Sequence, residues 1–175
     1  MSGPGQVWEQ VAEAFGRQLS AVTEDQWSAS TPCSEWTVRE LVDHTIATQC
    51  GVGGALGAKV DPSVGWDKVA DAVGTAMGNP ANFEGAMEGG PFAGMPKHQV
   101  AGLAVGDLLL HTWDLAKAIG GDTTLPPEAV EAVHLGLSRM PPQMMRGSGR
   151  FGDEVEVPQD ASAQDKMIAF SGRQP

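Results

Sequence analysis

The chain has 175 residues and a formal net charge of −11, from 11 Lys and Arg residues against 22 Asp and Glu residues. This acidic balance, without a cluster of basic residues, argues against a nucleic-acid partner and against binding to an anionic membrane surface. No long apolar segment is free of charge and the amino-terminal segment lacks the features of a signal peptide, so we expect no membrane span and a cytoplasmic location.

Apolar residues at intervals of three and four predict an amphipathic helix over residues 6–22. After a connection rich in turn residues, a second helix is predicted over residues 37–50. Thr37 and Glu40 have the T-x-x-E spacing of a capping box, which marks the start of this helix. Several glycines follow Cys50, and because glycine is a poor helix former we expect the helix to end there.

The rest of the chain also has helical periodicity, interrupted by segments rich in glycine and proline. The remaining predicted elements are a helix over 63–78, a loop over 79–96, helices over 97–119 and 126–138, and a tail over 139–175 with one or two further helical turns. Strands do not alternate with helices, so we predict an all-α fold. It would be a single domain over residues 1–175, a four-helix bundle with short extra helices and an irregular C-terminal tail packed on it.

The predicted helix over 97–119 carries ionisable residues among its leucines. Asp107 and His111 are four residues apart, so their side chains are neighbours on one face, and Asp114 flanks the same side. These residues point where the apolar residues point, towards the interior of the bundle. Because a buried charge is costly unless it is paired, this group of polar side chains needs a partner.

A carboxylate and an imidazole at this spacing can bind one divalent metal, with a further ligand from a facing helix. His44 lies at the edge of the apolar face of the second predicted helix, so we predict a metal site of His44, Asp107 and His111. Two nitrogens and one oxygen leave an open position, as in catalytic zinc sites, and nickel or ferrous iron suits the same donors. Asp114 would orient a liganding histidine or act as a general base.

Other interpretations of these residues stay open at this point. The spacing of Asp107 and His111 also fits an ordinary hydrogen-bonded pair without a metal. The two cysteines, Cys33 and Cys50, are expected to be free thiols in a reducing compartment. Cys33 is either a reactive thiol near a helix start or a small residue that fills a turn. The second interpretation is preferred because no histidine accompanies it in the sequence.

Three segments resemble one family. Residues 31–49, "TPCSEWTVRELVDHTIATQ", resemble the start of the second helix in the DinB-like superfamily, in the branch related to the N-terminal domain of mycothiol-dependent maleylpyruvate isomerase. Residues 106–120, "GDLLLHTWDLAKAIG", resemble the second motif of that branch, an acid-x-x-x-His-x-Trp-Asp segment. Residues 151–175 are similar to the closing segment of small actinobacterial members. The resemblance implies a DinB-type bundle with one divalent metal, with ligands at His44 and at the acid–histidine pair.

The resemblance also implies a thiol-dependent transferase that uses mycothiol or bacillithiol. The chain departs from the isomerase in carrying Asp107 in place of Glu, and residues 139–175 are too few for the isomerase's C-terminal domain. We therefore expect a metal-dependent enzyme, a thiol S-transferase or a related isomerase-like enzyme, rather than maleylpyruvate isomerisation itself. Its thiolate would attack a small electrophile.

Two alternative functions stay open. One is a non-catalytic bundle protein, for example a stress-related one, that binds a small hydrophobic molecule. The other is a catalyst of specialised metabolism that uses the pocket acids without a metal. The expected partners of the enzyme are a small-molecule electrophile and a low-molecular-weight thiol such as mycothiol, with no nucleic acid and no membrane. Formation of a homodimer also stays open, because apolar residues on the helix surfaces could form an interface.

Overall fold

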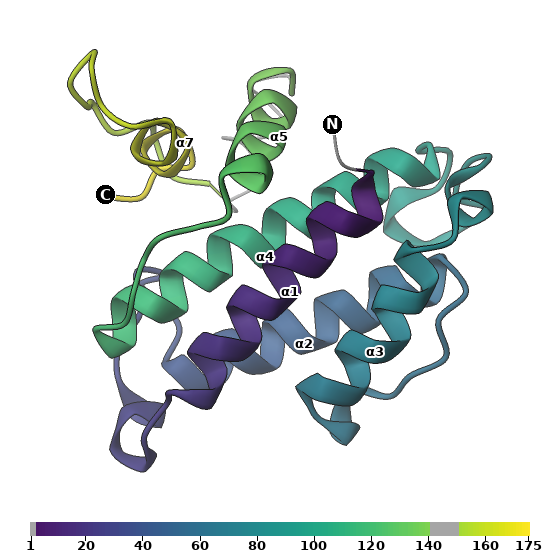
Figure 1. The fold of residues 1–175 in the computed structure, drawn as a ribbon, viewed down its shortest axis with the longest axis horizontal. Helices are drawn as coiled ribbons and strands as arrows, with labels where there is room; N and C mark the ends of the chain where they lie inside the picture. Colours follow the sequence, from purple (N-terminus) through teal and green to yellow (C-terminus); the bar gives the residue numbers. More distant parts are fainter. Residues whose placement is uncertain (1–2, 141–150) are drawn as a thin grey trace.

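Four helices pack side by side in the computed structural model, which describes residues 3–140 and 151–175 (Figure 1). Two further helices lie together on one side of them. The helices are α1 (Pro4–Ser20), α2 (Val38–Ala55), α3 (Trp66–Met77), α4 (Lys97–Ile119), α5 (Pro127–Ser138) and α7 (Ala163–Phe170). Single 3₁₀ turns interrupt the connections, and the described residues contain no strand beyond two isolated β-bridges. The predicted all-α bundle is confirmed.

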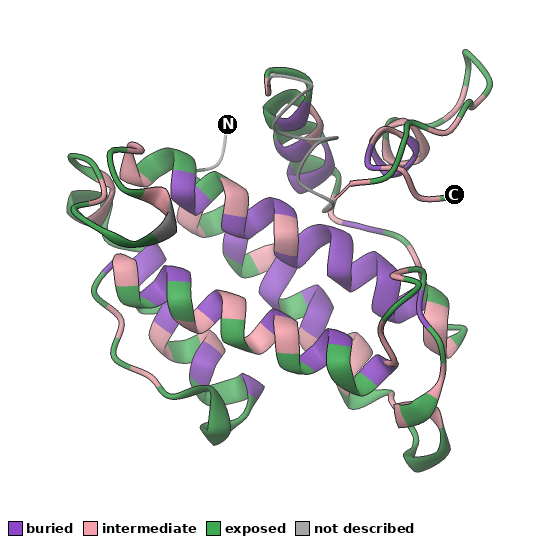
Figure 2. Ribbon diagram, turned by 180° about the vertical axis from the view of Figure 1, so that it is seen from behind, coloured by how far each residue is buried: buried purple, intermediate pink, exposed green. Residues whose placement is uncertain are grey.

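Helix α4 is the central element of the bundle. It packs against α1, α2 and α5, and Figure 2 shows it buried along most of its length. Leu108, Leu109 and Leu115 have no exposed surface, and each fully buried leucine contributes about 1.5–3 kcal/mol to stability. Because this helix is surrounded, polar side chains on it must find partners inside the protein.

A buried hydrogen-bond chain ties three of these helices together. The indole Nε1 of Trp8 in α1 donates to Oε1 of Gln49 in α2 at 2.9 Å. The Gln49 amide in turn donates to the carbonyl oxygen of Ala104 in α4 at 3.1 Å. Trp8 and Gln49 are almost fully buried, so these bonds fix the register of α2 against α4.

The start of α2 was predicted correctly, but its end was not. The Thr37 hydroxyl accepts from the Glu40 amide and the Glu40 carboxylate accepts from the Thr37 amide, which confirms the capping box. The helix then continues to Ala55, beyond the predicted end at Cys50. A Cβ atom on Gly53 would lie 2.6 Å from Cγ2 of Val73 in α3, so glycine permits a close helix contact. This packing outweighs the poor helix propensity of glycine.

The C-terminal segment folds back onto the bundle through α7, which packs against α5. Helix α7 ends in a Schellman turn: the Gly172 amide donates to the carbonyl of Ala169, and the Arg173 amide donates to the carbonyl of Ile168. Gly172 has the positive φ of 87° that this turn requires. Residues 141–150 of the predicted tail lie outside the described residues. The turn fixes the backbone from which the Arg173 side chain extends.

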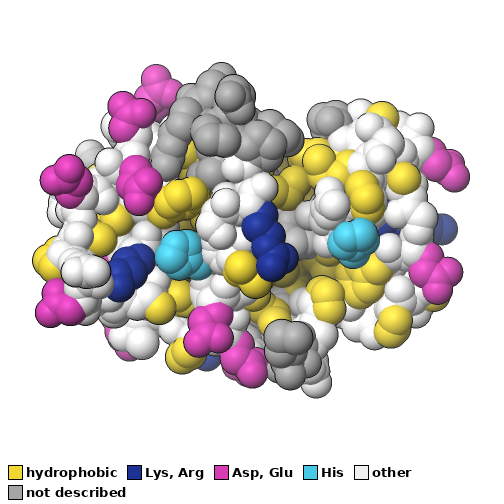
Figure 3. All heavy atoms as spheres, turned by 90° about the horizontal axis from the view of Figure 1, so that it is seen from above, with side chains coloured by type: hydrophobic (Ala, Val, Ile, Leu, Met, Phe, Trp, Pro, Cys, Tyr) yellow, Lys and Arg dark blue, Asp and Glu magenta, His cyan; other side chains and the backbone are white. Residues whose placement is uncertain are grey.

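The surface agrees with the acidic composition. On the face drawn in Figure 3, Lys and Arg side chains lie apart from one another and form no continuous basic patch. None of the helices in the described ranges is long and apolar enough to cross a membrane.

Candidate metal centre

Helices α2 and α4 bring the three predicted ligands together. Nε2 of His44 lies 3.7 Å from Oδ1 of Asp107, and Nε2 of His111 lies 3.5 Å from the same oxygen. One potential ligand atom from each residue lies within 4.8 Å of the other two. The i, i+4 spacing on α4 therefore does present Asp107 and His111 to one point, and α2 supplies His44 to that point from across the helix interface.

The second oxygen of the Asp107 carboxylate is buried, but it differs from the polar atoms around it in its lack of a hydrogen bond from the described part of the chain. Among the described residues, Oδ2 of Asp107 is the buried side-chain oxygen or nitrogen atom without a hydrogen-bond partner. A buried carboxylate oxygen without a donor is costly, so such atoms usually have a partner in the working protein. A cation bound between Asp107 and the two imidazoles would supply that partner.

The charges at this point are strongly coupled. Burial opposes ionisation of both Asp107 and His111, but their contact with each other, the contact of Asp107 with His44 and that of His111 with Asp114 outweigh it. The pKa of the Asp107 carboxyl is consequently far below its usual range, and the pKa of the His111 imidazole is well above its usual range. Without a metal, a protonated His111 ring balances the negative charge of the Asp107 carboxylate. A divalent cation bound to His111 would take the place of a proton on that ring.

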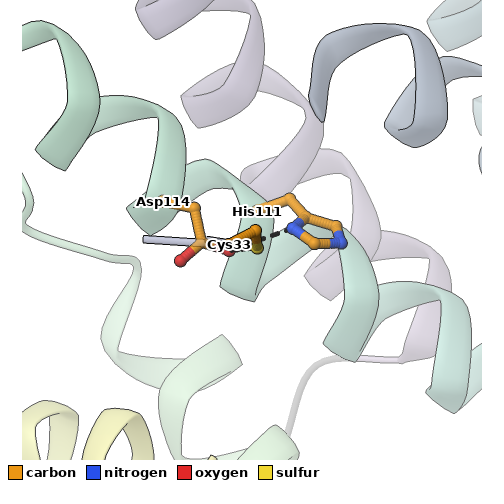
Figure 4. A group of neighbouring side chains, drawn as sticks. All are labelled: Cys33, His111 and Asp114. Atoms are coloured by element: carbon orange, nitrogen blue, oxygen red, sulfur yellow. Dashed lines mark hydrogen bonds and ion pairs between the residues drawn. The ribbon is translucent and has the colours of Figure 1, made fainter. Parts of the chain in front are cut away.

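A second group of polar side chains occupies the other edge of the His111 ring (Figure 4). Nδ1 of His111 lies 3.0 Å from Oδ2 of Asp114, whose side chain is completely buried. Arg173 binds this carboxylate with two nitrogens, Nε to Oδ1 and Nη2 to Oδ2, each at 2.7 Å. Burial raises the pKa of Asp114, but the bonds from Arg173 and His111 outweigh it and leave that pKa lowered.

Cys33 also reaches this group, which the preferred sequence interpretation did not anticipate. Its thiol lies 3.3 Å from Oδ2 of Asp114 and donates to it. The turn that contains Cys33 is held by the Thr31 hydroxyl, which accepts from the Cys33 amide and lies 2.9 Å from the carbonyl oxygen of Trp36. Cys33 therefore does fill a turn, but that turn carries its thiol to the candidate site. Folding supplies the histidine neighbour that the local sequence lacks.

Cys33, His111 and Asp114 form a second set of residues with metal-ligand spacing. In this set, however, the Arg173 guanidinium already supplies the positive charge at Asp114. A metal ion there would be repelled by the guanidinium, whereas the positive charge that the described residues offer at Asp107 comes from the two imidazoles. Of the two sets, the one that contains His44 is the better candidate for a metal.

Sequence reasoning gave no site role to Arg173 or Trp36. The Trp36 ring lies beside the two imidazoles, tilted relative to both, with ring centroids 4.4 Å from His44 and 5.7 Å from His111. Arg173 is 59 residues from Asp114 in the chain, so no local spacing links them. The sequence did indicate that Asp114 needs a partner, since a carboxylate on an apolar helix requires a cationic or hydrogen-bonding group nearby.

Comparison with known proteins matches the first half of the chain to a family. The family model for the mycothiol maleylpyruvate isomerase N-terminal domain matches residues 8–88, which include most of α1, all of α2 and α3, and His44. The chain belongs to this family. The resemblance seen in the motifs is thereby confirmed, although Asp107 and His111 lie beyond the matched residues of the isomerase-domain family.

Two relatives match nearly the whole chain and are themselves uncharacterized. Two uncharacterized proteins from two strains of Mycobacterium tuberculosis are each 34% identical to the chain over 174 residues, covering 94% of this chain and 94% of the relative. The comparison with solved structures found no match. The family is therefore known, while the particular reaction has to be argued from the site.

Proposed function

We propose that the chain binds one divalent metal, zinc in the first instance, through His44, Asp107 and His111. It uses the metal to activate a low-molecular-weight thiol, mycothiol, for attack on a small electrophile. The observation that carries the proposal is the convergence of these three residues from two helices, together with the buried Oδ2 of Asp107, which has no hydrogen-bond partner among the described residues. The family's description supports mycothiol as the thiol.

The ligand residues and their neighbours have the chemistry that binding a metal and activating a thiol require. A bound divalent cation would favour the thiolate, which is the nucleophilic form of the thiol. Asp107 contributes the negative charge of the ligand set, and Asp114 accepts a hydrogen bond at Nδ1 of His111, which leaves Nε2 of that ring for the metal. In an addition to an electrophilic double bond, a sulfur–carbon bond forms and the thiol hydrogen ends on the neighbouring carbon, so no further reactant is needed.

The exposure of the ligands indicates where the substrates approach. The His44 side chain is 38% exposed and that of Asp107 is 28% exposed, whereas that of His111 is only 9% exposed. The site is thus open beside His44 and closed behind His111. The Trp36 ring beside His44 offers an apolar surface for the electrophile at this opening.

The same geometry gives no support to acid catalysis without a metal. Both oxygens of Asp114 are engaged by Arg173, His111 and Cys33, and its pKa is lowered. The pKa of Asp107 is also lowered. Both groups would stay ionised at neutral pH and would be poor proton carriers. Of the two roles predicted for Asp114, its contacts favour the orientation of His111 over general-base catalysis.

Zinc binding provides the first test. Protein stripped with EDTA would be titrated with zinc by calorimetry and its metal content measured by elemental analysis. We expect one zinc per chain in the wild type, and a loss of affinity of about 100-fold or more in His44→Ala and His111→Ala, since changes to groups around the ligands alone cost 10–100-fold. His98→Ala is the matched control, because His98 is exposed in the first turn of α4. Unchanged zinc content in both ligand variants would refute the metal site.

Activity is tested separately with mycothiol and a panel of small electrophiles. We expect conjugates to form with the zinc-loaded protein, and formation to stop after chelation and in the His111→Ala variant. Conjugation that continues in the presence of EDTA would contradict the metal-dependent reaction. Tight ligand binding that persists after chelation, without turnover, would identify a binding protein instead.

A further inference from the structure

The segment that follows α7 delivers one side chain to the candidate metal centre. Arg173 is the residue immediately after Gly172 in the Schellman turn, so its backbone is fixed by the end of the helix. Its side chain is fixed as well, since Nη1 donates to the Ser171 hydroxyl at 3.3 Å. Only 11% of the Arg173 side chain is exposed. The guanidinium is therefore held in one place beside the bundle.

This guanidinium binds the Asp114 carboxylate in a bidentate, fork-like geometry. Two of its nitrogens each lie 2.7 Å from a different oxygen of Asp114, whose side chain has no exposed surface. Two parallel bonds fix both the position and the plane of the carboxylate. A lysine in this place would offer a single point charge and would leave the plane free to turn.

The fixed carboxylate in turn orients the histidine. Oδ2 of Asp114 lies 3.0 Å from Nδ1 of His111, and a carboxylate in this position can only accept, so the proton must be on Nδ1. The opposite nitrogen, Nε2, then faces Asp107. Arg173, Asp114 and His111 form one continuous chain of contacts that ends at the candidate ligands.

We propose that Arg173 is a positioning residue of the metal centre: by clamping Asp114, it holds His111 with Nδ1 protonated and Nε2 directed at the metal. This inference rests on the proposed metal site and deepens it. It makes the segment after α7 a working part of a site whose ligands all lie on α2 and α4.

Zinc titrations of matched arginine variants test this inference. We expect Arg173→Gln to bind zinc about 10–100-fold more weakly than the wild type, as for other groups that orient a metal-binding histidine. Arg173→Lys should fall between the two, because it keeps the charge and loses the fork. Arg17→Gln is the control, because Arg17 is 67% exposed and pairs with Glu13 on the surface of α1. Affinity should be unchanged in the control.

A second background separates positioning from general loss of structure. If Arg173 acts through Asp114, then in an Asp114→Asn protein the further change Arg173→Gln should leave the zinc affinity the same within about twofold. Each variant is first checked for folding by circular dichroism. A folded Arg173→Gln variant that binds zinc as tightly as a zinc-binding wild type would overturn the inference while leaving the metal site in place.

Long-range ¹H–¹⁵N spectra of the zinc-loaded wild type give a readout that needs no variant. We expect the His111 signals of a ring protonated at Nδ1 and metal-bound at Nε2. Coordination through Nδ1 would overturn the inference, and this result would decide the matter even if the Arg173 variants failed to fold. A wild type that binds no zinc would overturn the proposed function itself, which is a distinct outcome.

Discussion

Gly53 offers a direct test of the packing that carries α2 past its predicted end. A Cβ atom there would lie 2.6 Å from Cγ2 of Val73 and 3.2 Å from Cβ of Ala58. Val73 is completely buried and its β-branched side chain has little rotamer freedom, so it cannot move aside cheaply. Overpacking of this kind costs about 1–3 kcal/mol. Alanine would recover up to about 1 kcal/mol through its better helix propensity.

We therefore expect Gly53→Ala to lower the free energy of unfolding by about 1–2 kcal/mol, and hence to lower Tm by roughly 2–8 °C for a chain of this size. Gly51→Ala and Gly54→Ala are matched controls on the same helix, because a Cβ atom at either position meets nothing within 4 Å. In these controls the propensity gain acts alone, so both variants should be as stable as the wild type or more stable.

Urea denaturation of the metal-free proteins, followed by circular dichroism, measures these differences. The double variant with Val73→Ala completes a cycle, because the smaller side chain removes the overlap. We expect Gly53→Ala to cost less in that background, by at least about 0.5 kcal/mol, as for residues in direct contact. A Gly53→Ala protein as stable as the two controls would refute the close approach of α2 and α3.

The remaining predictions concern the site and its supports. Zinc must displace a proton from His111, whose pKa is raised, so zinc affinity measured by calorimetry should fall as pH falls, by up to about tenfold per pH unit. In the metal-free protein the same protonated ring stabilises the fold, so its contribution to the free energy of unfolding should be lost as pH rises through the raised pKa. Gly172→Ala places a side chain at φ 87°, and should cost at least about 1–2 kcal/mol in urea denaturation and weaken zinc binding. Trp8→Phe removes the donor to Gln49, and should cost about 1–3 kcal/mol in the same denaturation assay; a change under about 0.5 kcal/mol would contradict the buried hydrogen bond.

Local patterns in the sequence were enough to predict most of the helices. The helix over 97–119 has the predicted bounds, because apolar residues recur along its whole length and Gly120 adopts the left-handed conformation that ends it. The end of α2 could not be predicted in this way. It depends on the fit of Gly53 against Val73, and that contact exists only once two helices have packed.

The residues of the candidate site also fall into those that local spacing predicts and those that only the folded chain brings together. Asp107 and His111 are neighbours through helical geometry alone. His44 could be added to the predicted ligands because the apolar periodicity of its helix shows which face the residue lies on. Arg173 and Cys33 reach Asp114 from 59 and 81 residues away along the chain, through a helix-ending turn and a loop. Neither contact has a local spacing that would reveal it, so the sequence predicts the proposed ligands and Asp114, but not Arg173 and Cys33 beside them.

The Asp114–Arg173 pair also has a consequence for the order in which the protein matures on the ribosome. Translation produces all of α1 to α4 well before it produces residue 173, so Asp114 is present in the nascent bundle before its guanidinium partner exists. Burying a carboxylate without that guanidinium is costly. We therefore expect a chain that lacks the segment after α7 to close its interior less tightly around Asp114 than the full chain does.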